Sequence, residues 1–402
     1  MFTTHPKNTL TDNQTLRVLV VTESFLPQIN GVTNSVCHVV EQLQTKGHTV
    51  EVIAPTGPDD YAGATVHRVN GLDLPGYSDF TLGMTTQRRI RNIMKAVQPD
   101  VVHVASPFVL GHTAIQAANN LRLPVVSIYQ TDLVGLAQRY RLRGLTSFVE
   151  HRLRRIHEQS ILNLVPSTTS FEQLQALRIP RLRYWPRGID VQRFRPDNRD
   201  ESLHARLTST YLLAQPQQRD VVVGYVGRLA KEKDLHHLQS LQHLPGVRVV
   251  IAGGGPEEAA LKARLPIARF VGPQYGDELA TLMATFDIFV HPGANETFCQ
   301  AVQEAMASGV PAIGPAAGGL KDRIEHGRTG LHYRPGDFEG LSTAVEHLAA
   351  DPVLRARMGH EARQTVLHRS WGHVTQRLIE YYLAAMSTMN TQPLRPIPAA
   401  AC

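Results

Sequence analysis

Short runs of apolar, mostly β-branched residues alternate with segments of helical periodicity along the whole chain. Several of these runs are continuously apolar, which is typical of parallel strands buried on both faces. In the first half the pattern predicts strands at 16–23, 50–55, 101–106, 125–130 and 162–167. Helices are predicted between them, including residues 33–46 before Gly47 and residues 111–121 before Pro124.

The second half starts the same alternation again. The predicted strands are 221–227, 247–253, 268–272, 288–292 and 311–314, and the predicted helices between them include 256–265, 277–285 and 298–308. A repeated strand–helix–strand order implies parallel sheets with right-handed crossovers. The pattern therefore predicts an α/β fold in both halves.

A polar stretch divides the two halves. Residues 187–220 are rich in charge and carry Pro196 and Pro216, and the chain of 402 residues has room for two domains of ordinary size. We expect an N-terminal Rossmann-like domain at 1–190, completed by a C-terminal helix at 371–402, and a second Rossmann-like domain at 191–370. Two facing sheets of this kind would bind a ligand in an interdomain cleft, at the carboxyl ends of their strands.

Composition narrows the partners and the compartment. Lys and Arg exceed Asp and Glu by 41 − 35 = 6, which favours anionic partners without choosing among them. The widely spaced Cys37, Cys299 and Cys402 form neither a disulfide framework nor a zinc site. Residues 1–15 lack the apolar core of a signal peptide, and no apolar run approaches the roughly 20 residues of a membrane span. A cytoplasmic protein without a zinc site is the expectation.

Glutamates mark both ends of a segment that follows the predicted strand at 288–292. Glu296 and Glu304 are eight residues apart, and on one helix they would be separated by about 12 Å along its axis. The paired carboxyl groups of glycoside hydrolases are only about 5–9.5 Å apart, so these two are not expected to flank one bond. They can reach two parts of a long ligand, such as the sugar and the ribose of a nucleotide sugar. A solvated helix face with two ordinary glutamates stays an open alternative.

Two cations follow the strand predicted at 221–227. Arg228 and Lys233 are five residues apart in one loop. A guanidinium offers a fork of donors to phosphate oxygens, and an ammonium offers a compact charge. Beside a cleft, such a pair suits a leaving diphosphate, on which negative charge develops as a glycosidic bond breaks. Taken alone, the pair is also compatible with surface charge.

Two glycine-containing turns are candidates for close approach to a ligand. Gly254 is the middle one of three glycines between a predicted strand and a predicted helix, but Pro256 interrupts the Gly-x-Gly-x-x-Gly fingerprint of nicotinamide sites. Asn30 and Gly31 open the first predicted helix, where backbone N–H groups favour an anion. By itself that segment is also compatible with a simple loop.

Taken together, these motifs resemble the retaining glycosyltransferases of family 4 over roughly residues 16–348. In chain order the motifs are Asn30-Gly31, Gly227-Arg228 with Lys233, Gly253-Gly254-Gly255-Pro256, 287–292, Glu296 with Glu304, 305–311 and Gly318-Gly319. The resemblance implies the GT-B fold of two facing Rossmann-like domains, retention of anomeric configuration, and catalysis without a metal or another cofactor.

The same resemblance implies roles for individual residues. Arg228 and Lys233 would hold the donor diphosphate, Glu296 the hydroxyl groups of the donor sugar, and Glu304 the ribose. Gly31 would lie against the phosphates from the other domain. Further donor-binding positions implied by the motifs are Asn30, Gly254 and Phe298.

One departure from the family concerns the reacting carbon. Many relatives carry His-Thr-Asp after a strand of the first domain, whereas this chain has Gln130-Thr131-Asp132. A glutamine cannot take up a proton, so general-base catalysis is excluded there. Gln130 can still hydrogen-bond to the donor sugar, which fits a front-face reaction in which the leaving phosphate takes the acceptor's proton. We therefore count Gln130 with Glu296, Arg228 and Lys233 as candidate catalytic residues.

Three residues are expected on the acceptor side: His103, Asp132 and Arg139. His103 ends a predicted strand and would face the rim of the cleft, although a packed, hydrogen-bonded histidine is an equally open interpretation. The segments around Gln130, Arg139 and Glu296 look most like those of GDP-mannose-dependent α-mannosyltransferases that build bacterial glycolipids. Cys299 stands at a helix start where glycine is common in relatives, and no nucleophilic role is expected for it.

Two basic stretches suggest an anionic membrane surface as a partner. They comprise Arg88, Arg89, Arg91 and Lys95, and Arg139, Arg141, Arg143, Arg152, Arg154 and Arg155, the second interleaved with apolar residues. Such a segment can lie on anionic lipid, and an ordinary solvated helix face is the open alternative. We expect peripheral association with the inner face of the cell membrane and a lipid or glycolipid acceptor.

Other functions fit less well. A nucleic-acid-binding protein would need basic and aromatic residues spread along one face, so no nucleic acid is expected. A sugar-nucleotide epimerase lacks the Glu296–Glu304 context, and a dehydrogenase needs the missing glycine fingerprint. A UDP-sugar-dependent transferase and a non-catalytic sugar-nucleotide binder stay as alternatives, the latter disfavoured because Glu296 and Lys233 are both present.

Overall fold

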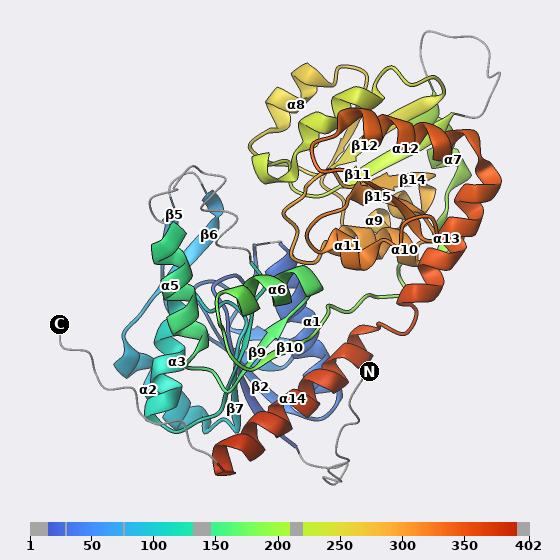
Figure 1. Cartoon of the computed structure of the whole chain (residues 1–402). Helices are drawn as coiled ribbons and strands as arrows, with labels where there is room; N and C mark the ends of the chain where they lie inside the picture. The colour runs from blue at the N-terminus through green and yellow to red at the C-terminus, as the bar shows by residue number, and fades with distance from the viewer. Residues whose placement is uncertain (1–14, 29, 75–76, 132–145, 210–219, 392–402) are drawn as a thin grey trace. The chain divides into compact units, whose positions relative to one another are not determined.

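The computed structural model of the chain describes residues 15–28, 30–74, 77–131, 146–209 and 220–391 (Figure 1). The chain divides into two compact units. One is made of residues 1–127, 159–161 and 381–402, and the other of residues 128–158 and 162–380. The domain ranges expected from the sequence, 1–190 and 191–370, stay a prediction.

An eight-stranded sheet forms in the first half of the chain, in the order β10-β9-β8-β7-β1-β2-β4-β3. Its central strands are parallel, and Val20 of β1 lies opposite Val52 of β2 and His103 of β7. The edge strand β3 instead runs antiparallel to β4. The strands are β1 (Arg17–Val21), β2 (Thr49–Ala54), β3 (Asp60–Tyr61), β4 (Ala64–Arg68), β7 (Val101–Val104), β8 (Val125–Ile128), β9 (Leu162–Val165) and β10 (Leu182–Tyr184). The five strands predicted for this half are confirmed.

Helix α2 shows how a helix of this half packs one apolar stripe. In α2 the side chain of Thr86 caps the N-terminus by accepting from the Arg89 N–H, and the buried Ile90 and Met94 lie one turn apart. The helices are α1 (Gly31–Thr45), α2 (Gln87–Val97), α3 (Leu110–Asn120), α5 (Thr146–His157) and α6 (Thr168–Ala176), and α14 (Trp371–Thr391) is the last described helix of the chain. Helices α1 and α3 occupy the ranges that the sequence predicts.

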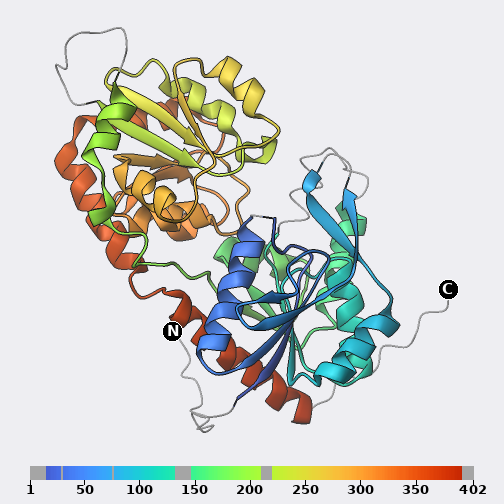
Figure 2. The same cartoon turned by 180° about the vertical axis from the view of Figure 1, so that it is seen from behind.

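A separate antiparallel hairpin stands beside this sheet (Figure 2). Its strands are β5 (Asn70–Leu74) and β6 (Tyr77–Met84). The fully buried Glu23, directly after β1, accepts from the N–H groups of Gly83 (3.0 Å) and Leu110 (2.5 Å). This carboxylate therefore ties the hairpin to the start of α3, a contact that the sequence pattern did not indicate.

A six-stranded sheet forms in the second half, in the order β13-β12-β11-β14-β15-β16, and every strand is parallel to its neighbours. The strands are β11 (Val221–Val226), β12 (Val247–Ala252), β13 (Arg269–Gly272), β14 (Ile288–Val290), β15 (Ala312–Pro315) and β16 (Gly330–Tyr333). The five strands predicted for this half are confirmed, and β16 is an additional one. A parallel sheet with helical crossovers is what the alternating pattern predicts.

Helices bury both faces of the second sheet (Figure 1). Val222 of β11 belongs to one apolar core, and its neighbours Val221 and Val223 belong to the core on the other face. This two-sided burial explains why the strands read as continuous apolar runs. The helices are α7 (Glu201–Thr208), α8 (Glu258–Arg264), α9 (Gly276–Thr285), α10 (Gln300–Ala307), α11 (Leu320–Arg323), α12 (Phe338–Ala350) and α13 (Pro352–Val366), with short 3₁₀ helices η2 (Pro196–Asn198), η3 (Lys231–Lys233) and η4 (Leu235–Leu241).

The loops at the carboxyl ends of β11 and β12 touch each other through glycine backbone. Gly253 has a φ of 145°, and a Cβ added there would lie 1.9 Å from the carbonyl oxygen of Gly227. Only glycine permits this approach. The edge of the sheet that binds ligands in open α/β folds is therefore closely packed here, and the loop after β11 carries Arg228 and Lys233.

Candidate functional site

Three charged side chains meet at the carboxyl edge of the second sheet, and we refer to Lys233, Glu296 and His291 as the Lys233–Glu296 cluster. Lys233 Nζ donates to Glu296 Oε1 at 2.5 Å, and His291 Nε2 lies 3.3 Å from the same oxygen. Lys233 ends η3 after β11, whereas His291 directly follows β14. The side chains of Lys233 and Glu296 are 23% and 15% exposed. The structure thus brings together two residues that the sequence analysis assigned to the diphosphate and the sugar.

Mutual attraction keeps this cluster ionised. Burial alone would raise the pKa of Glu296, but Lys233 and His291 hold it well below its usual range. Burial likewise acts to lower the pKa of His291, and the neighbouring Cys299 and Glu296 outweigh it and raise that pKa. The pKa of Lys233 is also raised, because attraction to Glu296 outweighs burial. A fixed negative charge and two donors with positive charge are therefore available to a polar ligand.

The loop that carries Glu296 rests on two glycines and an aromatic ring. The N–H of Gly319 donates to the carbonyl oxygen of Glu296 at 2.6 Å, and a Cβ on Gly318 would lie 2.6 Å from that oxygen. The Phe298 ring is 1% exposed, with the guanidinium carbon of Arg323 at 4.7 Å from its centroid. The Gly318-Gly319 motif thus packs closely against the backbone of the loop that carries Glu296. Phe298, expected beside the donor, is placed as a packing anchor.

One sequence expectation about this loop is wrong. Helix α10 begins at Gln300, not at 298, so Glu296 lies outside the helix that carries Glu304. The predicted separation of about 12 Å assumed that both carboxylates belong to one helix, and it does not apply. The reason is local, because Cys299 adopts a left-handed conformation with φ 64° and turns the chain before the helix starts.

Cys299 predicts a difference between two small substitutions. Cys299→Gly and Cys299→Ala both remove the buried sulfur, but only glycine adopts φ 64° without the clash of a Cβ. We expect the glycine variant to be more stable than the alanine variant by about 1 kcal/mol. Urea unfolding of both variants measures this difference, and an alanine variant of equal or higher stability would contradict the argument.

Glu304 occupies the second turn of α10 and is half-buried. Burial raises its pKa to about 8, and a hydrogen bond with the Gln300 side chain opposes that shift only in part. A half-buried carboxyl group with a raised pKa is typical of a binding or catalytic site. Its expected partner, the ribose of a nucleotide, stays a prediction.

Arg228 and Gly254 lie in adjoining loops. The carbonyl oxygen of Arg228 accepts from the Tyr225 hydroxyl at 3.1 Å, and that of Gly254 accepts from the Leu229 N–H at 2.9 Å. These bonds fix the backbone on both sides of the Arg228 side chain. The structure therefore places Arg228 and Lys233 in one well-held loop, as expected, and their contact with a diphosphate stays a prediction.

Asn30 caps the first helix of the other unit. Its Oδ1 accepts from the N–H groups of Val32 and Thr33, each at 3.0 Å, and its Nδ2 donates to Ser24 Oγ at 2.6 Å. Gly31 follows as the exposed first residue of α1. The Asn30 side chain thus already serves two of the N–H groups that the sequence analysis offered to an anion.

The acceptor-side residues are only partly described. His103 is 1% exposed, its Nδ1 lies 2.5 Å from the Tyr382 hydroxyl of α14, and burial lowers its pKa to about 3. It is a packed histidine in this structure, and it does not face a rim as one expectation had it. Asp132 and Arg139 lie outside the described residues.

Gln130 is joined to an arginine that the sequence analysis did not single out. Arg187 Nη2 donates to Gln130 Oε1 at 3.0 Å, and both side chains are 7% exposed. The hydroxyl of Thr297 donates to the backbone carbonyl oxygen of Gln130 at 3.1 Å. Gln130 is therefore held next to the loop of Glu296. A charged residue in the apolar context Trp185-Pro186-Arg187 was the available signal.

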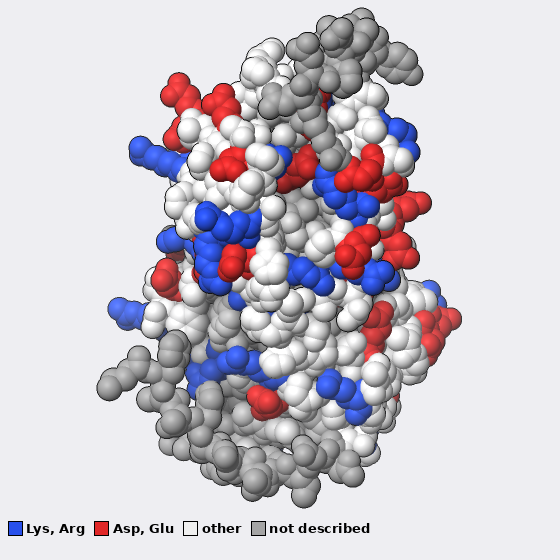
Figure 3. Space-filling model, turned by 90° about the vertical axis from the view of Figure 1, so that its right-hand side faces the viewer, with Lys and Arg blue, Asp and Glu red and all other residues white. Residues whose placement is uncertain are grey.

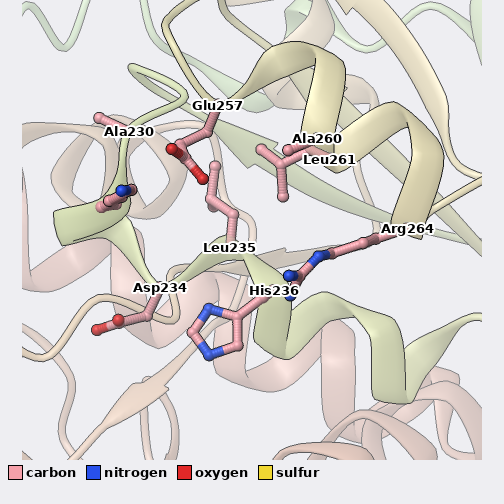
Figure 4. Close-up of a pocket in the computed structure, with 9 residues that line it drawn as sticks. Ala230, Asp234, Leu235, His236, Glu257, Ala260, Leu261 and Arg264 are labelled. Atoms are coloured by element: carbon pink, nitrogen blue, oxygen red, sulfur yellow. The ribbon is translucent and has the colours of Figure 1, made fainter.

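A pocket of about 350 Å³ opens beside the Lys233 loop (Figure 4). Helix α8 forms one wall with Arg264 and Leu261, and η3 and η4 form the other with Asp234 and His236 (Figure 4). Lys233 and Glu296 do not line it. The pocket is thus adjacent to the candidate site and distinct from it.

Among the residues that the structure describes, two groups of side chains offer atoms that could hold a metal ion. They are Asp234, His236 and His237, and His291, Glu296 and Cys299, with the ligand atoms of each group within 4.8 Å of one another. In the second group the Lys233 ammonium already neutralises the Glu296 carboxylate, which disfavours a further cation. A reaction without a metal stays a prediction.

Comparison with known protein families gives two matches in series. Residues 29–193 match the model described as Glycosyltransferase Family 4, and residues 214–365 match the model described as Glycosyl transferases group 1. The second match contains the Lys233–Glu296 cluster and Glu304. Both matches agree with the family that the motifs resemble.

Two similar proteins are named GDP-mannose-dependent alpha-mannosyltransferase. The one from Mycobacterium tuberculosis is 43% identical over 385 residues, which cover 94% of this chain and 99% of that protein. The one from Mycolicibacterium smegmatis is 42% identical over 379 residues, which cover 92% and 98%. The similarity therefore extends over nearly the whole of both chains.

Among solved structures, Anabaena HepE in complex with UDP and glucose is similar with a TM-score of 0.72. The sequences are 18% identical, and the match covers 92% of this chain and 100% of HepE. At that identity the likeness shows the fold alone. It confirms the predicted α/β fold class, with parallel sheets in two halves.

Proposed function

This chain belongs to the family 4 glycosyltransferases, and on that premise we propose that it transfers mannose from GDP-mannose, with retention of configuration, to a lipid or glycolipid acceptor. The observation that carries the proposal is the Lys233–Glu296 cluster at the carboxyl edge of the second sheet. It joins a cation suited to phosphate oxygens to a carboxylate suited to sugar hydroxyl groups. The names of the two similar mannosyltransferases support the choice of donor.

In the proposed reaction the sugar nucleotide binds at the Lys233–Glu296 cluster and replaces the ion pair between Lys233 and Glu296. Lys233 turns to the diphosphate together with Arg228, and Glu296 accepts hydrogen bonds from the hexose. The acceptor hydroxyl attacks the anomeric carbon as the bond to the diphosphate breaks, and the leaving phosphate oxygen takes the proton of that hydroxyl. No protein base is needed, which agrees with a glutamine at position 130.

A donor screen tests this function. Purified protein is incubated with GDP, UDP and ADP, and the midpoint of thermal unfolding is measured for each nucleotide. We expect stabilisation by GDP above that by UDP and ADP, followed by mannosylated product from GDP-mannose and a lipid extract. Stabilisation by UDP alone, with hexose transfer only from a UDP-sugar, would replace the mannose assignment with the UDP-sugar alternative.

Helix α5 supports the proposed contact with a membrane. Phe148 is 63% exposed, and Arg152 and Arg155 follow at positions i+4 and i+7 on the same face. Arg154 and Arg155 are exposed. Basic residues around an exposed aromatic ring suit the interface of an anionic bilayer. Among the described helices, none has both the length and the hydropathy needed to cross a membrane.

Charge reversal on α5 is expected to weaken binding to anionic vesicles by about tenfold or more, since each basic residue near such a surface contributes about 1 kcal/mol. The variant carries Glu at Arg152, Arg154 and Arg155. Its control carries Glu at three exposed basic residues elsewhere, Lys262, Lys321 and Arg357. Co-sedimentation with phosphatidylglycerol vesicles measures both. Equal loss in the two variants, or no binding by the unaltered protein, would remove the membrane from the proposal.

The face of the molecule drawn in Figure 3 does not favour a nucleic-acid partner. On the face drawn in Figure 3, Lys and Arg side chains are interspersed with Asp and Glu and form no continuous basic stripe. A groove that tracks a phosphate backbone needs such a stripe. The modest excess of positive charge is better explained by the diphosphate site and by α5.

A further inference from the structure

We propose that Arg187 is a positioning residue for glycosyl transfer, which fixes the side-chain amide of Gln130 with its NH₂ group directed away from Arg187 and towards the donor. The inference rests on the proposed function, since it assigns Gln130 a hydrogen bond to the sugar nucleotide. It adds a residue that lies outside the motifs named above.

The chemistry of the pair settles the orientation of the amide. A guanidinium has only donors, so the atom of Gln130 that lies 3.0 Å from Arg187 Nη2 must be the carbonyl oxygen Oε1. The two ends of a glutamine amide are otherwise hard to distinguish. The NH₂ group therefore occupies the opposite end, as a donor. A donor there suits an oxygen of the sugar or the phosphate, which is an acceptor.

Arg187 is itself held by the start of α10. Gln303 Nε2 donates to the carbonyl oxygens of Arg187 (3.2 Å) and Gly188 (3.0 Å), and Gln300 Nε2 donates to that of Gly188 at 3.1 Å. The guanidinium carbon lies 5.9 Å from the centroid of the Phe298 ring. These contacts come from the segment that follows Glu296. Arg187 thus links the loop of Glu296 to Gln130.

The backbone of Gln130 is fixed from the same side. The hydroxyl of Thr297, the neighbour of Glu296, donates to the carbonyl oxygen of Gln130 at 3.1 Å. With its backbone held by Thr297 and its amide oxygen held by Arg187, the Gln130 side chain has little freedom to rotate. A preorganised donor of this kind lowers the barrier more than a mobile one.

Arg187 remains charged in this position. Burial lowers its pKa to about 10, with Glu296 and Cys299 opposing that shift, so it stays protonated at neutral pH. The positive charge of the Arg187 guanidinium next to the amide oxygen of Gln130 polarises the amide and makes its NH₂ group a stronger donor. The charge would also oppose a protonated histidine at position 130. The glutamine at this position and the buried arginine therefore suit each other.

A double-mutant cycle tests the proposal with Arg187→Met, Gln130→Met and the double variant. We expect each single variant to lower kcat by about 10- to 100-fold, with a change in KM for GDP-mannose below about threefold. The double variant should be no slower than the slower single variant, because the two residues act as one unit. Arg187→Lys, which keeps the charge and lacks the fork, should recover part of the loss.

Arg323 provides a matched control. It is buried, its guanidinium packs on the same Phe298 ring at 4.7 Å, and it donates to the Tyr184 hydroxyl. Arg323→Met therefore removes a comparable buried charge and should affect stability. Combined with Gln130→Met, its effect on kcat should be additive.

Two results would overturn the positioning role. One is additivity of Arg187→Met and Gln130→Met in kcat, and the other is coupling of the pair in melting temperature alone, which would make the bond structural. The unaltered protein decides the proposed function separately. If it transferred hexose only from another sugar nucleotide, the GDP-mannose assignment would be wrong. The kcat values of the double-mutant cycle would then be measured with that sugar nucleotide. If the unaltered protein transferred no hexose, both ideas would be wrong.

Discussion

Replacing Lys233 with methionine is expected to lower mannosyl transfer by about 10²–10³-fold and to destabilise the folded protein. The loss of turnover follows from the removal of a cation that stabilises charge on the leaving diphosphate, a kind of contact that contributes about 10²–10³-fold when one donor is lost. The loss of stability follows from the 2.5 Å bond to Glu296. Without Lys233 a largely buried carboxylate loses its 2.5 Å partner and keeps the more distant His291 at 3.3 Å, and breaking such a pair costs about 3–5 kcal/mol.

A second substitution separates the two effects. Glu296→Gln in the Lys233→Met background removes the uncompensated charge, so the double variant should regain most of the melting temperature. It should stay inactive, because Glu296 is the proposed partner of the hexose. The measurements are thermal unfolding and initial rates with GDP-mannose. Glu296→Ala alone is expected to be nearly inactive as well.

The outcome that contradicts the assignment is equally sharp. If both Lys233→Met and Glu296→Ala kept the turnover of the unaltered protein, the cluster would be a structural ion pair and the donor would bind elsewhere. Recovery of turnover together with stability in the double variant would have the same meaning. An exposed substitution such as Lys321→Met should change neither quantity.

Most strands of this fold could be predicted from the sequence, because a strand buried on both faces is a continuous run of apolar residues. The ten strands expected from apolar runs are all present. Strands β3, β4, β10 and β16 and the hairpin β5–β6 were not anticipated, since strands of two to five residues and hairpins without a continuous apolar run give a weak signal. Their position depends on tertiary contacts such as Glu23 with Gly83, which are far apart in sequence.

The identity of the residues in the candidate site could be predicted from the sequence, whereas their geometry could be predicted less well. The motifs led to Lys233 and Glu296, which the structure brings into contact. The start of α10 was misplaced because a cysteine in the left-handed region cannot be recognised from residue preferences, which would put glycine there. Arg187 was missed because its partner, Gln130, is 57 residues away.

Glu304 is expected to reduce stability in order to serve nucleotide binding. Its pKa in the folded protein is raised to about 8 by burial. The folded state therefore binds a proton more tightly than the unfolded state does, and the stability linked to that proton is complete below about pH 4.5 and is lost as the pH rises through 8. Glu304→Gln imitates the protonated form at every pH. At pH 9 the variant should be more stable than the unaltered protein by about 2–4 kcal/mol, and at pH 5 the difference should fall below about 1 kcal/mol.

The same substitution should weaken the binding of GDP. Ribose hydroxyl groups donate to a carboxylate more strongly than to an amide, and a lost hydrogen bond to a charged group costs about 1.5–3 kcal/mol, or about 10- to 100-fold in affinity. Calorimetric titration with GDP at pH 5 and pH 9 measures it, and the affinity of the unaltered protein should rise with pH as Glu304 ionises. Glu346→Gln, at an exposed position of α12, is the control for loss of a carboxylate. A Glu304→Gln variant that gained no stability at pH 9, or that bound GDP as tightly as the unaltered protein, would remove Glu304 from the ribose.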